Sequence, residues 1–230
     1  MKSVYWYAPN ILGYGRIALC LAAFTMHAFG HWGWCAILYW MSFFFDYFDG
    51  YLAKRFNQAS KFGGSLDMIT DRWATAGLCL ILSQIFPRWT PVFVLLIGID
   101  FFSHYFLTYY SELQNSESHK DIGKQGGGGW MLRTYYNNRR FMIVVSTGGE
   151  LFYLFLYLSY YTASGGTLWS LLSWNSWQVC TVICLPFFLM KQWANIEQLV
   201  MSTNGIVRID QLARKEESQE PAISAEADQT

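Results

Sequence analysis

Four aspartates, Asp46, Asp49, Asp67 and Asp71, lie at the edges of two strongly apolar segments of the chain. An ionised Asp near the centre of a bilayer costs about 2.5–3.5 kcal/mol on insertion scales, so four together would cost on the order of 10 kcal/mol. One or two divalent cations in a water-accessible cavity would offset this cost. The residues therefore indicate metal-assisted chemistry at a membrane surface.

The spacing of these aspartates places each pair on one face of a helix. Asp46 and Asp49 are three residues apart, and Asp67 and Asp71 are four apart. The connection between the pairs is short, so we expect two antiparallel helices that pack together, with all four carboxylates near one membrane edge. Such oxygen ligands suit Mg²⁺ or Mn²⁺, and two ions would form a clamp for a phosphoryl-type displacement. Solvated caps at helix ends are the alternative, but they do not explain four aspartates at these spacings.

The composition is typical of a membrane protein. Of the 230 residues, 53% are apolar and 19% aromatic, more than in a soluble domain. The net charge is zero, so no global field favours nucleic acid as a partner. We therefore expect an all-α polytopic membrane protein. Segments of roughly 20 apolar residues predict six transmembrane helices: Asn10–Phe29, Trp32–Ala53, Leu66–Phe86, Pro91–Leu113, Phe141–Tyr161 and Trp174–Val200.

The distribution of basic residues predicts the topology. Most of the lysines and arginines outside the spans lie at the two ends of the chain and in the connections after the second and fourth predicted helices. The connections after the first, third and fifth predicted helices carry only Arg88. Because cytosolic segments are enriched in Lys and Arg, both termini and the aspartates are expected on the cytosolic side. We divide the chain into a membrane domain over residues 1–205 and a polar, disordered cytosolic tail over residues 206–230.

The run from Asp46 to Asp71 resembles a known family signature. It reads Asp46-x2-Asp49-Gly50-x2-Ala53-Lys54-x8-Gly63-x3-Asp67-x3-Asp71 and is similar to the motif of the CDP-alcohol phosphatidyltransferases. Every spacing agrees, and Lys54 stands where the family usually has Arg. Within this family the chain resembles the eukaryotic phosphatidylinositol synthases. That resemblance is carried by Pro9-Asn10-x2-Gly13-Tyr14-x-Arg16, Asn57-Gln58, Ser116–Lys120, Arg133-x-Tyr135-Tyr136 and Glu150–Tyr153.

The resemblance implies an enzyme that joins CDP-diacylglycerol and myo-inositol into phosphatidylinositol and releases CMP. The four aspartates would hold two Mg²⁺ or Mn²⁺ ions, and Asp71 would also be the general base. Gly50, Lys54 and Ser60 match family positions that contact CDP-diacylglycerol, and Asn10 and Arg16 would shape the nucleotide pocket. Lys120 and Arg133 are candidates for inositol binding. The resemblance also implies a homodimer in the membrane of the endoplasmic reticulum, or of the Golgi.

Two alternatives stay open at this stage. One is the same chemistry with another acceptor, of the glycerol 3-phosphate or choline type, since basic residues are available in the polar segment 114–140. The other is a divalent-cation transporter that uses the carboxylates as its pathway. Transport is disfavoured because the four aspartates are confined to one side of the predicted membrane.

Overall fold

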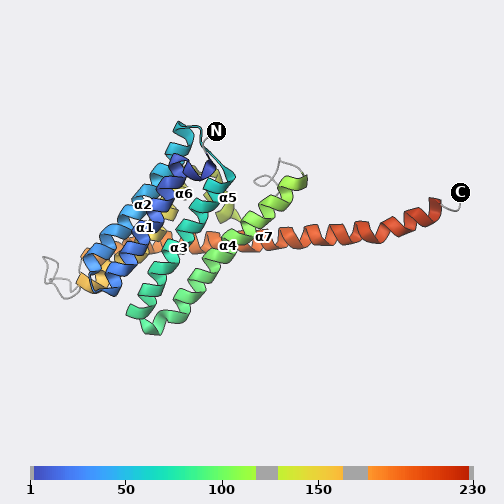
Figure 1. Cartoon of the computed structure of the whole chain (residues 1–230). Helices are drawn as coiled ribbons and strands as arrows, with labels where there is room; N and C mark the ends of the chain where they lie inside the picture. The colour runs from blue at the N-terminus through green and yellow to red at the C-terminus, as the bar shows by residue number, and fades with distance from the viewer. Residues whose placement is uncertain (1–2, 118–128, 163–175, 228–230) are drawn as a thin grey trace. The chain divides into compact units, whose positions relative to one another are not determined.

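The structure is a computed structural model that describes residues 3–117, 129–162 and 176–227, and every regular element in these ranges is helical (Figure 1). The prediction of an all-α protein is thereby confirmed for the described residues. Two short 3-10 turns are η1 (Val4–Trp6) and η2 (Pro87–Trp89). The α-helices are α1 (Ala8–Ala28), α2 (Trp32–Arg55), α3 (Lys61–Ile85), α4 (Thr90–Glu117), α5 (Trp130–Asn137), α6 (Arg139–Thr162) and α7 (Ser176–Ala227).

Four of these helices are long and apolar enough to cross a membrane, namely α1, α4, α6 and the Ser176–Lys215 part of α7. The chain is therefore an integral membrane protein by the length and composition of its helices. α2 and α3 also coincide with predicted spans and have 24 and 25 residues. They are less apolar because they carry the aspartates, basic residues and, in α2, several Trp and Tyr side chains.

The polar end of the chain continues α7 as far as Ala227, into the segment for which composition predicts disorder. A polar helix without a packed apolar face is marginal in water. We therefore keep, as a prediction, a tail over residues 206–230 that is disordered in solution.

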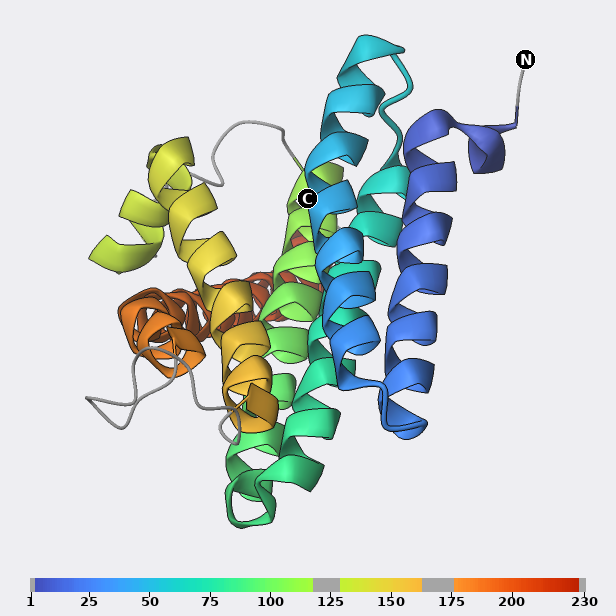
Figure 2. The ribbon, with the colours of Figure 1, turned by 90° about the vertical axis from the view of Figure 1, so that its left-hand side faces the viewer.

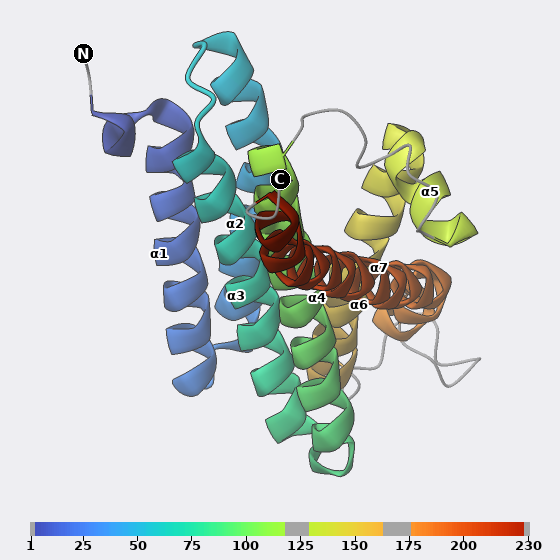
Figure 3. The same cartoon turned by 90° about the vertical axis from the view of Figure 1, so that its right-hand side faces the viewer.

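The chain divides into two compact units. The first unit contains Met1–Gly98 and Ile143–Lys191, and the second contains Ile99–Met142 and Gln192–Thr230. The aspartates all belong to the first unit. There α1 packs against both α2 and α3, and Figures 2 and 3 show the three helices side by side from opposite sides.

Small side chains and one aromatic wedge explain this packing. Cys20 and Ala23 of α1 and Cys35 and Ala36 of α2 are buried, so the two backbones can approach closely. The Phe24 ring of α1 contacts Tyr39 of α2 and Trp73 of α3, with ring centroids 6.4 Å and 5.7 Å apart. The expected direct packing of α2 along α3 is wrong, since α1 packs against both helices and the two do not pack against each other to a comparable extent.

The second unit is held by buried polar side chains. Asn195 of α7 donates to Asp100 of α4 at 3.0 Å, and Gln198 of α7 donates to the Ser103 carbonyl oxygen, also at 3.0 Å. The short helix α5 lies in the polar connection that the sequence left without structure. Its Leu132 N–H donates to the Glu197 carboxylate at 2.8 Å, which fixes its first turn to α7.

Candidate metal centre

The carboxylates of α2 and α3 converge as their spacing predicts. Asp46 and Asp49 lie in the last turns of α2, and Asp67 and Asp71 lie in the first half of α3. One carboxylate oxygen from each of Asp46, Asp49 and Asp67 lies within 4.8 Å of the other two. All four side chains are partly exposed, between 13% and 45%. The group is therefore open to ions and substrate.

A single buried cation from α1 contacts all four aspartates. The Arg16 Nη1 atom lies 2.6 Å from Asp46, 3.0 Å from Asp49 and 2.8 Å from Asp67. Its Nη2 atom donates to Asp71. The Arg16 side chain is only 3% exposed. The guanidinium therefore lies inside the bundle, and the carboxylates around it are the part of the network that solvent can reach.

The backbone beneath Arg16 is fixed by α2. The Ser42 hydroxyl donates to the Arg16 carbonyl oxygen at 3.1 Å and accepts a hydrogen bond from the Cys20 thiol at 3.1 Å. Both Ser42 and Cys20 are buried. The position of Arg16 therefore depends on the packing of α1 against α2.

The connection between the two aspartate helices has a defined geometry. α2 ends in a Schellman motif, in which Asn57 takes the left-handed φ of 52° and the Gln58 N–H donates to the Ala53 carbonyl oxygen at 2.9 Å. The Gln58 side chain then accepts a hydrogen bond from the Ala8 N–H at 2.8 Å, at the start of α1. Ser60 caps α3 by accepting from the Gly63 N–H at 3.0 Å. These contacts join the first turns of α1 and α3 to the end of α2.

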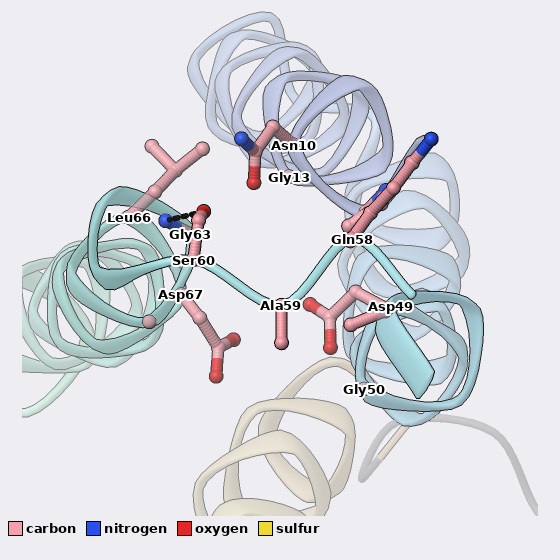
Figure 4. Close-up of a pocket in the computed structure, with 13 residues that line it drawn as sticks. Asn10, Gly13, Asp49, Gly50, Gln58, Ala59, Ser60, Gly63, Leu66 and Asp67 are labelled. Carbon is pink, nitrogen blue, oxygen red and sulfur yellow. Dashed lines mark hydrogen bonds between the residues drawn. The ribbon is translucent and has the colours of Figure 1, made fainter. Parts of the chain in front are cut away.

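A pocket of about 210 Å³ opens between these helix ends (Figure 4). The Asp49 and Asp67 carboxylates lie on one side of it, and Asn10 lies on α1. Gly63 leaves no room for a side chain there, because a Cβ atom would lie 2.8 Å from Asn10 Oδ1. The pocket thus combines carboxylates with backbone that is accessible at several small residues: Gly13, Gly50, Ala53, Ala59, Ser60, Gly63 and Gly64.

The residues predicted to bind substrate have different positions in the structure. Gly50 and Ser60 line the pocket, as do two of the aspartates. Lys54 is exposed and is not part of the lining. Arg133 is an exposed residue of α5 in the second unit, and Lys120 lies outside the described residues. The inositol assignment therefore stays a prediction.

One deeper carboxylate lies a helical turn below Asp71. The Thr75 hydroxyl bonds to the Asp71 carbonyl oxygen at 3.0 Å and approaches both oxygens of Glu150, at 3.1 Å and 3.0 Å. Glu150 comes from α6, so this contact connects the metal-centre helix α3 to α6. A partly buried carboxylate at this depth needs such polar partners in a bilayer.

Sequence reasoning underestimated α1. It assigned Arg16 and Asn10 to the nucleotide pocket, but it did not predict that one guanidinium would contact all four aspartates. The available signal was a lone arginine within an apolar segment, since such a cation requires buried counter-charges. Gln58 was recognised only as part of a resemblance, and its bond to Ala8 depends on how the chain folds back.

The donor set fits a divalent cation. Carboxylate oxygens are the ligands that Mg²⁺ and Mn²⁺ prefer, and here they already surround a positively charged nitrogen at 2.6–3.0 Å. Three such oxygens lie close enough together to share one ion. The adjoining pocket would hold an anionic ligand beside that ion.

A family model covers most of the chain. The model of the CDP-alcohol phosphatidyltransferase family matches residues 6–203 of the chain. No solved structure matches the chain.

Several curated proteins are similar over most of their length, and all three described here are named CDP-diacylglycerol–inositol 3-phosphatidyltransferase. The Schizosaccharomyces pombe protein is 34% identical over 90% of this chain and 92% of its own. The Saccharomyces cerevisiae protein is 37% identical over 86% of this chain and 84% of its own. The Homo sapiens protein is 30% identical over 91% of this chain and 95% of its own.

Proposed function

Because this chain belongs to the CDP-alcohol phosphatidyltransferase family, we propose that it is a CDP-diacylglycerol–inositol 3-phosphatidyltransferase. The reaction transfers the phosphatidyl group from CDP-diacylglycerol to myo-inositol and yields phosphatidylinositol and CMP. The observation that carries the proposal is the convergence of four aspartates on one cation beside a pocket. The names of the relatives specify the acceptor.

The four aspartates would hold the metal. We assign two Mg²⁺ or Mn²⁺ ions to Asp46, Asp49, Asp67 and Asp71, since oxygens of the first three lie within 4.8 Å of one another and Asp71 shares Arg16 with them. Bound divalent cations supply Lewis-acid polarisation of a diphosphate and offset the negative charge that develops on a departing nucleotide.

The pocket residues would orient CDP-diacylglycerol. Gly50 has no side chain, so a phosphate group can approach the α2 backbone directly. The Ser60 hydroxyl lies at the pocket wall beside the first turn of α3. Lys54 lies one turn beyond Gly50 and would interact with the diphosphate as a point charge.

Asp71 would act as the general base towards the acceptor. Its carboxylate would take the proton of the attacking inositol hydroxyl while that oxygen forms a bond to the β-phosphorus. The bond from this phosphorus to the oxygen that leads to CMP breaks, and CMP leaves with the electron pair. Lys120 and Arg133 are proposed to bind inositol, a neutral polyol that needs several hydrogen-bonding partners.

The membrane arrangement that we propose has six transmembrane helices, with both termini and the active site on the cytosolic side. The positive-inside distribution supports this topology, because Arg88 of η2 is the only basic residue predicted on the opposite side outside the helical spans. We further propose a homodimer in the endoplasmic reticulum or Golgi membrane. The membrane domain would cover residues 1–205 and the tail residues 206–230.

The test uses purified protein in detergent with CDP-diacylglycerol and Mn²⁺ or Mg²⁺. Radiolabelled inositol and radiolabelled glycerol 3-phosphate are added in parallel reactions, and lipid-soluble label and CMP release are measured. We expect label in lipid from inositol alone. Label from glycerol 3-phosphate alone would keep the metal centre but overturn the acceptor, and no label from either would contradict the proposed function.

A further inference from the structure

The guanidinium of Arg16 lies among the carboxylates that would hold a metal ion. Its Nη1 atom is surrounded by oxygens of Asp46, Asp49 and Asp67 at 2.6–3.0 Å. These are the same three residues whose carboxylate oxygens lie within 4.8 Å of one another and are arranged to share one ion. A cation bound by this triad and the Nη1 atom would therefore compete for the same space.

The two contacts also require different distances. A nitrogen donor needs about 2.7–2.9 Å to a carboxylate oxygen, whereas Mg²⁺ binds such an oxygen at about 2.0–2.1 Å. Each carboxylate has two oxygens, so it could accept from Arg16 through one oxygen and bind an ion through the other. An ion at the point where all three carboxylates meet would nevertheless need the Nη1 atom to move, because Nη1 lies 2.6–3.0 Å from one oxygen of each.

We propose that Arg16 is an internal counter-cation that competes with metal for Asp46, Asp49 and Asp67, so that metal binding displaces its Nη1 atom. The proposal rests on the proposed function, because it takes the four aspartates as the metal ligands. It gives Arg16 a role in metal affinity and in the stability of the metal-free protein. Arg16 is in this sense a positioning residue for the carboxylates.

The way in which Arg16 is held allows this movement. Its backbone is fixed through the Ser42 hydroxyl, but its guanidinium is held by the four carboxylates. The buried Nε atom has no hydrogen-bond partner among the described residues. A rotation of the side chain would thus break contacts only with the aspartates, and an incoming ion would replace those contacts.

The charges explain why such a counter-cation is needed. Four ionised aspartates carry a formal charge of −4. Arg16 contacts all four, and Arg72 lies 3.8 Å from Asp71, so the two arginines leave a formal charge of −2. Without metal and without Arg16, the carboxylates of α2 and α3 would repel one another at short range. Arg16 therefore stabilises the metal-free bundle and, for the same reason, weakens metal binding.

The experiment compares Mn²⁺ binding and thermal stability in the absence of substrate. Purified full-length parent, R16M, R16K and R88M proteins in detergent are freed of metal and titrated with Mn²⁺, with free Mn²⁺ followed by EPR. The melting temperature is measured with and without Mn²⁺. R88M is the control, because Arg88 is an exposed arginine of η2 and its loss removes the same charge elsewhere in the first unit.

For R16M we expect a lower melting temperature without Mn²⁺ and a Kd for Mn²⁺ that is at least about tenfold smaller than that of the parent. R88M should match the parent in both measurements. R16K keeps the charge but cannot hold four carboxylates with one ammonium group, so it should bind Mn²⁺ more tightly than the parent and less tightly than R16M.

Three outcomes would contradict the proposal in distinguishable ways. If R16M binds Mn²⁺ no more tightly than the parent, Arg16 does not compete with metal, although the metal centre stands. If R16M does not fold, R16K decides the question, and an unchanged Kd in R16K overturns the displacement. If neither the parent nor any variant binds Mn²⁺, the proposed metal centre itself is wrong.

Discussion

Four carboxylates of the first unit converge on one guanidinium, whereas the buried polar groups of the second unit pair with one another. In the second unit, Asn195 is matched with Asp100 and Gln198 with the Ser103 carbonyl oxygen, by bonds of 3.0 Å each. Asn195, Gln198 and Ser103 are almost completely buried, while the aspartates of the first unit remain partly exposed.

The difference separates a site from a structural contact. Paired, buried amides and hydroxyls hold membrane helices together and leave nothing to bind a ligand. Partly exposed carboxylates in excess over their counter-charge retain capacity for cations. An ionisable residue in a membrane helix is therefore a sign of function chiefly when its charges are not matched within the protein.

Removal of divalent metal should have the largest effect on activity, because it acts on the aspartates of the first unit and not on the polar pairs of the second. We expect EDTA to reduce phosphatidyl transfer to background, because no Lewis acid would then act on the diphosphate. Added Mn²⁺ or Mg²⁺ should restore CMP release. Full activity after exhaustive chelation would mean that the aspartates of the first unit do not differ in function from the polar pairs of the second unit.

The second largest effect on turnover is expected when one carboxylate in the first unit is replaced by an amide, with the same replacement in the second unit as the control. Asp71→Asn should lower the turnover rate by about 10²–10⁴-fold, because the amide cannot accept the proton of the inositol hydroxyl. Asp100→Asn is the matched control and should retain turnover close to that of the parent. Both are measured by incorporation of labelled inositol. An active Asp71→Asn enzyme would remove the general-base assignment, and equal losses in both variants would break the comparison.

Loss of a polar pair in the second unit should change stability instead of chemistry. Asn195→Leu removes the donor to Asp100 and leaves a buried carboxylate without that bond, which should cost about 1–3 kcal/mol. The free energy of unfolding in detergent or the melting temperature reports this loss, and turnover per folded molecule should be nearly unchanged. If the variant is stable but its turnover is strongly reduced, the polar pairs of the second unit take part in the reaction.

The smallest effect is expected from Lys54→Arg. The side chain is exposed, and the change restores the residue that the family signature usually has while it preserves the positive charge. We expect a change in turnover of less than about twofold. Steady-state kinetics with varied CDP-diacylglycerol measure it, and a large decrease in activity would mean that Lys54 has a specific contact that Arg cannot make.

Local pattern was sufficient for much of the site. The spacings of Asp46 to Asp49 and of Asp67 to Asp71 predicted two facing pairs, and each of the six apolar segments lies within or largely overlaps one long helix. The last helix was predicted to end at Val200, whereas α7 continues to Ala227. These features depend on helical periodicity, which the sequence expresses directly. Gly50 and Ser60 were likewise predicted near the site and line the pocket.

Tertiary contacts limited the rest of the prediction. The contacts of Arg16 with the aspartates join residues 30 to 55 positions apart, and the bond between Gln58 and Ala8 joins residues 50 positions apart. Such contacts depend on the packing of α1 against α2 and α3, and no local spacing encodes that packing. α5 was missed for a related reason, since eight residues form a stable helix only when a contact such as that to Glu197 fixes their first turn.

The shared guanidinium also has a consequence for biosynthesis. α1 carries a buried arginine and α2 carries two aspartates, so each of these helices alone would enter the membrane with charges that lack a partner. Arg16 can contact all four aspartates only after α1, α2 and α3 have all left the translocon. The amino-terminal third of this protein should therefore enter the membrane as a group of three helices, with charge pairing as one of the forces that completes insertion.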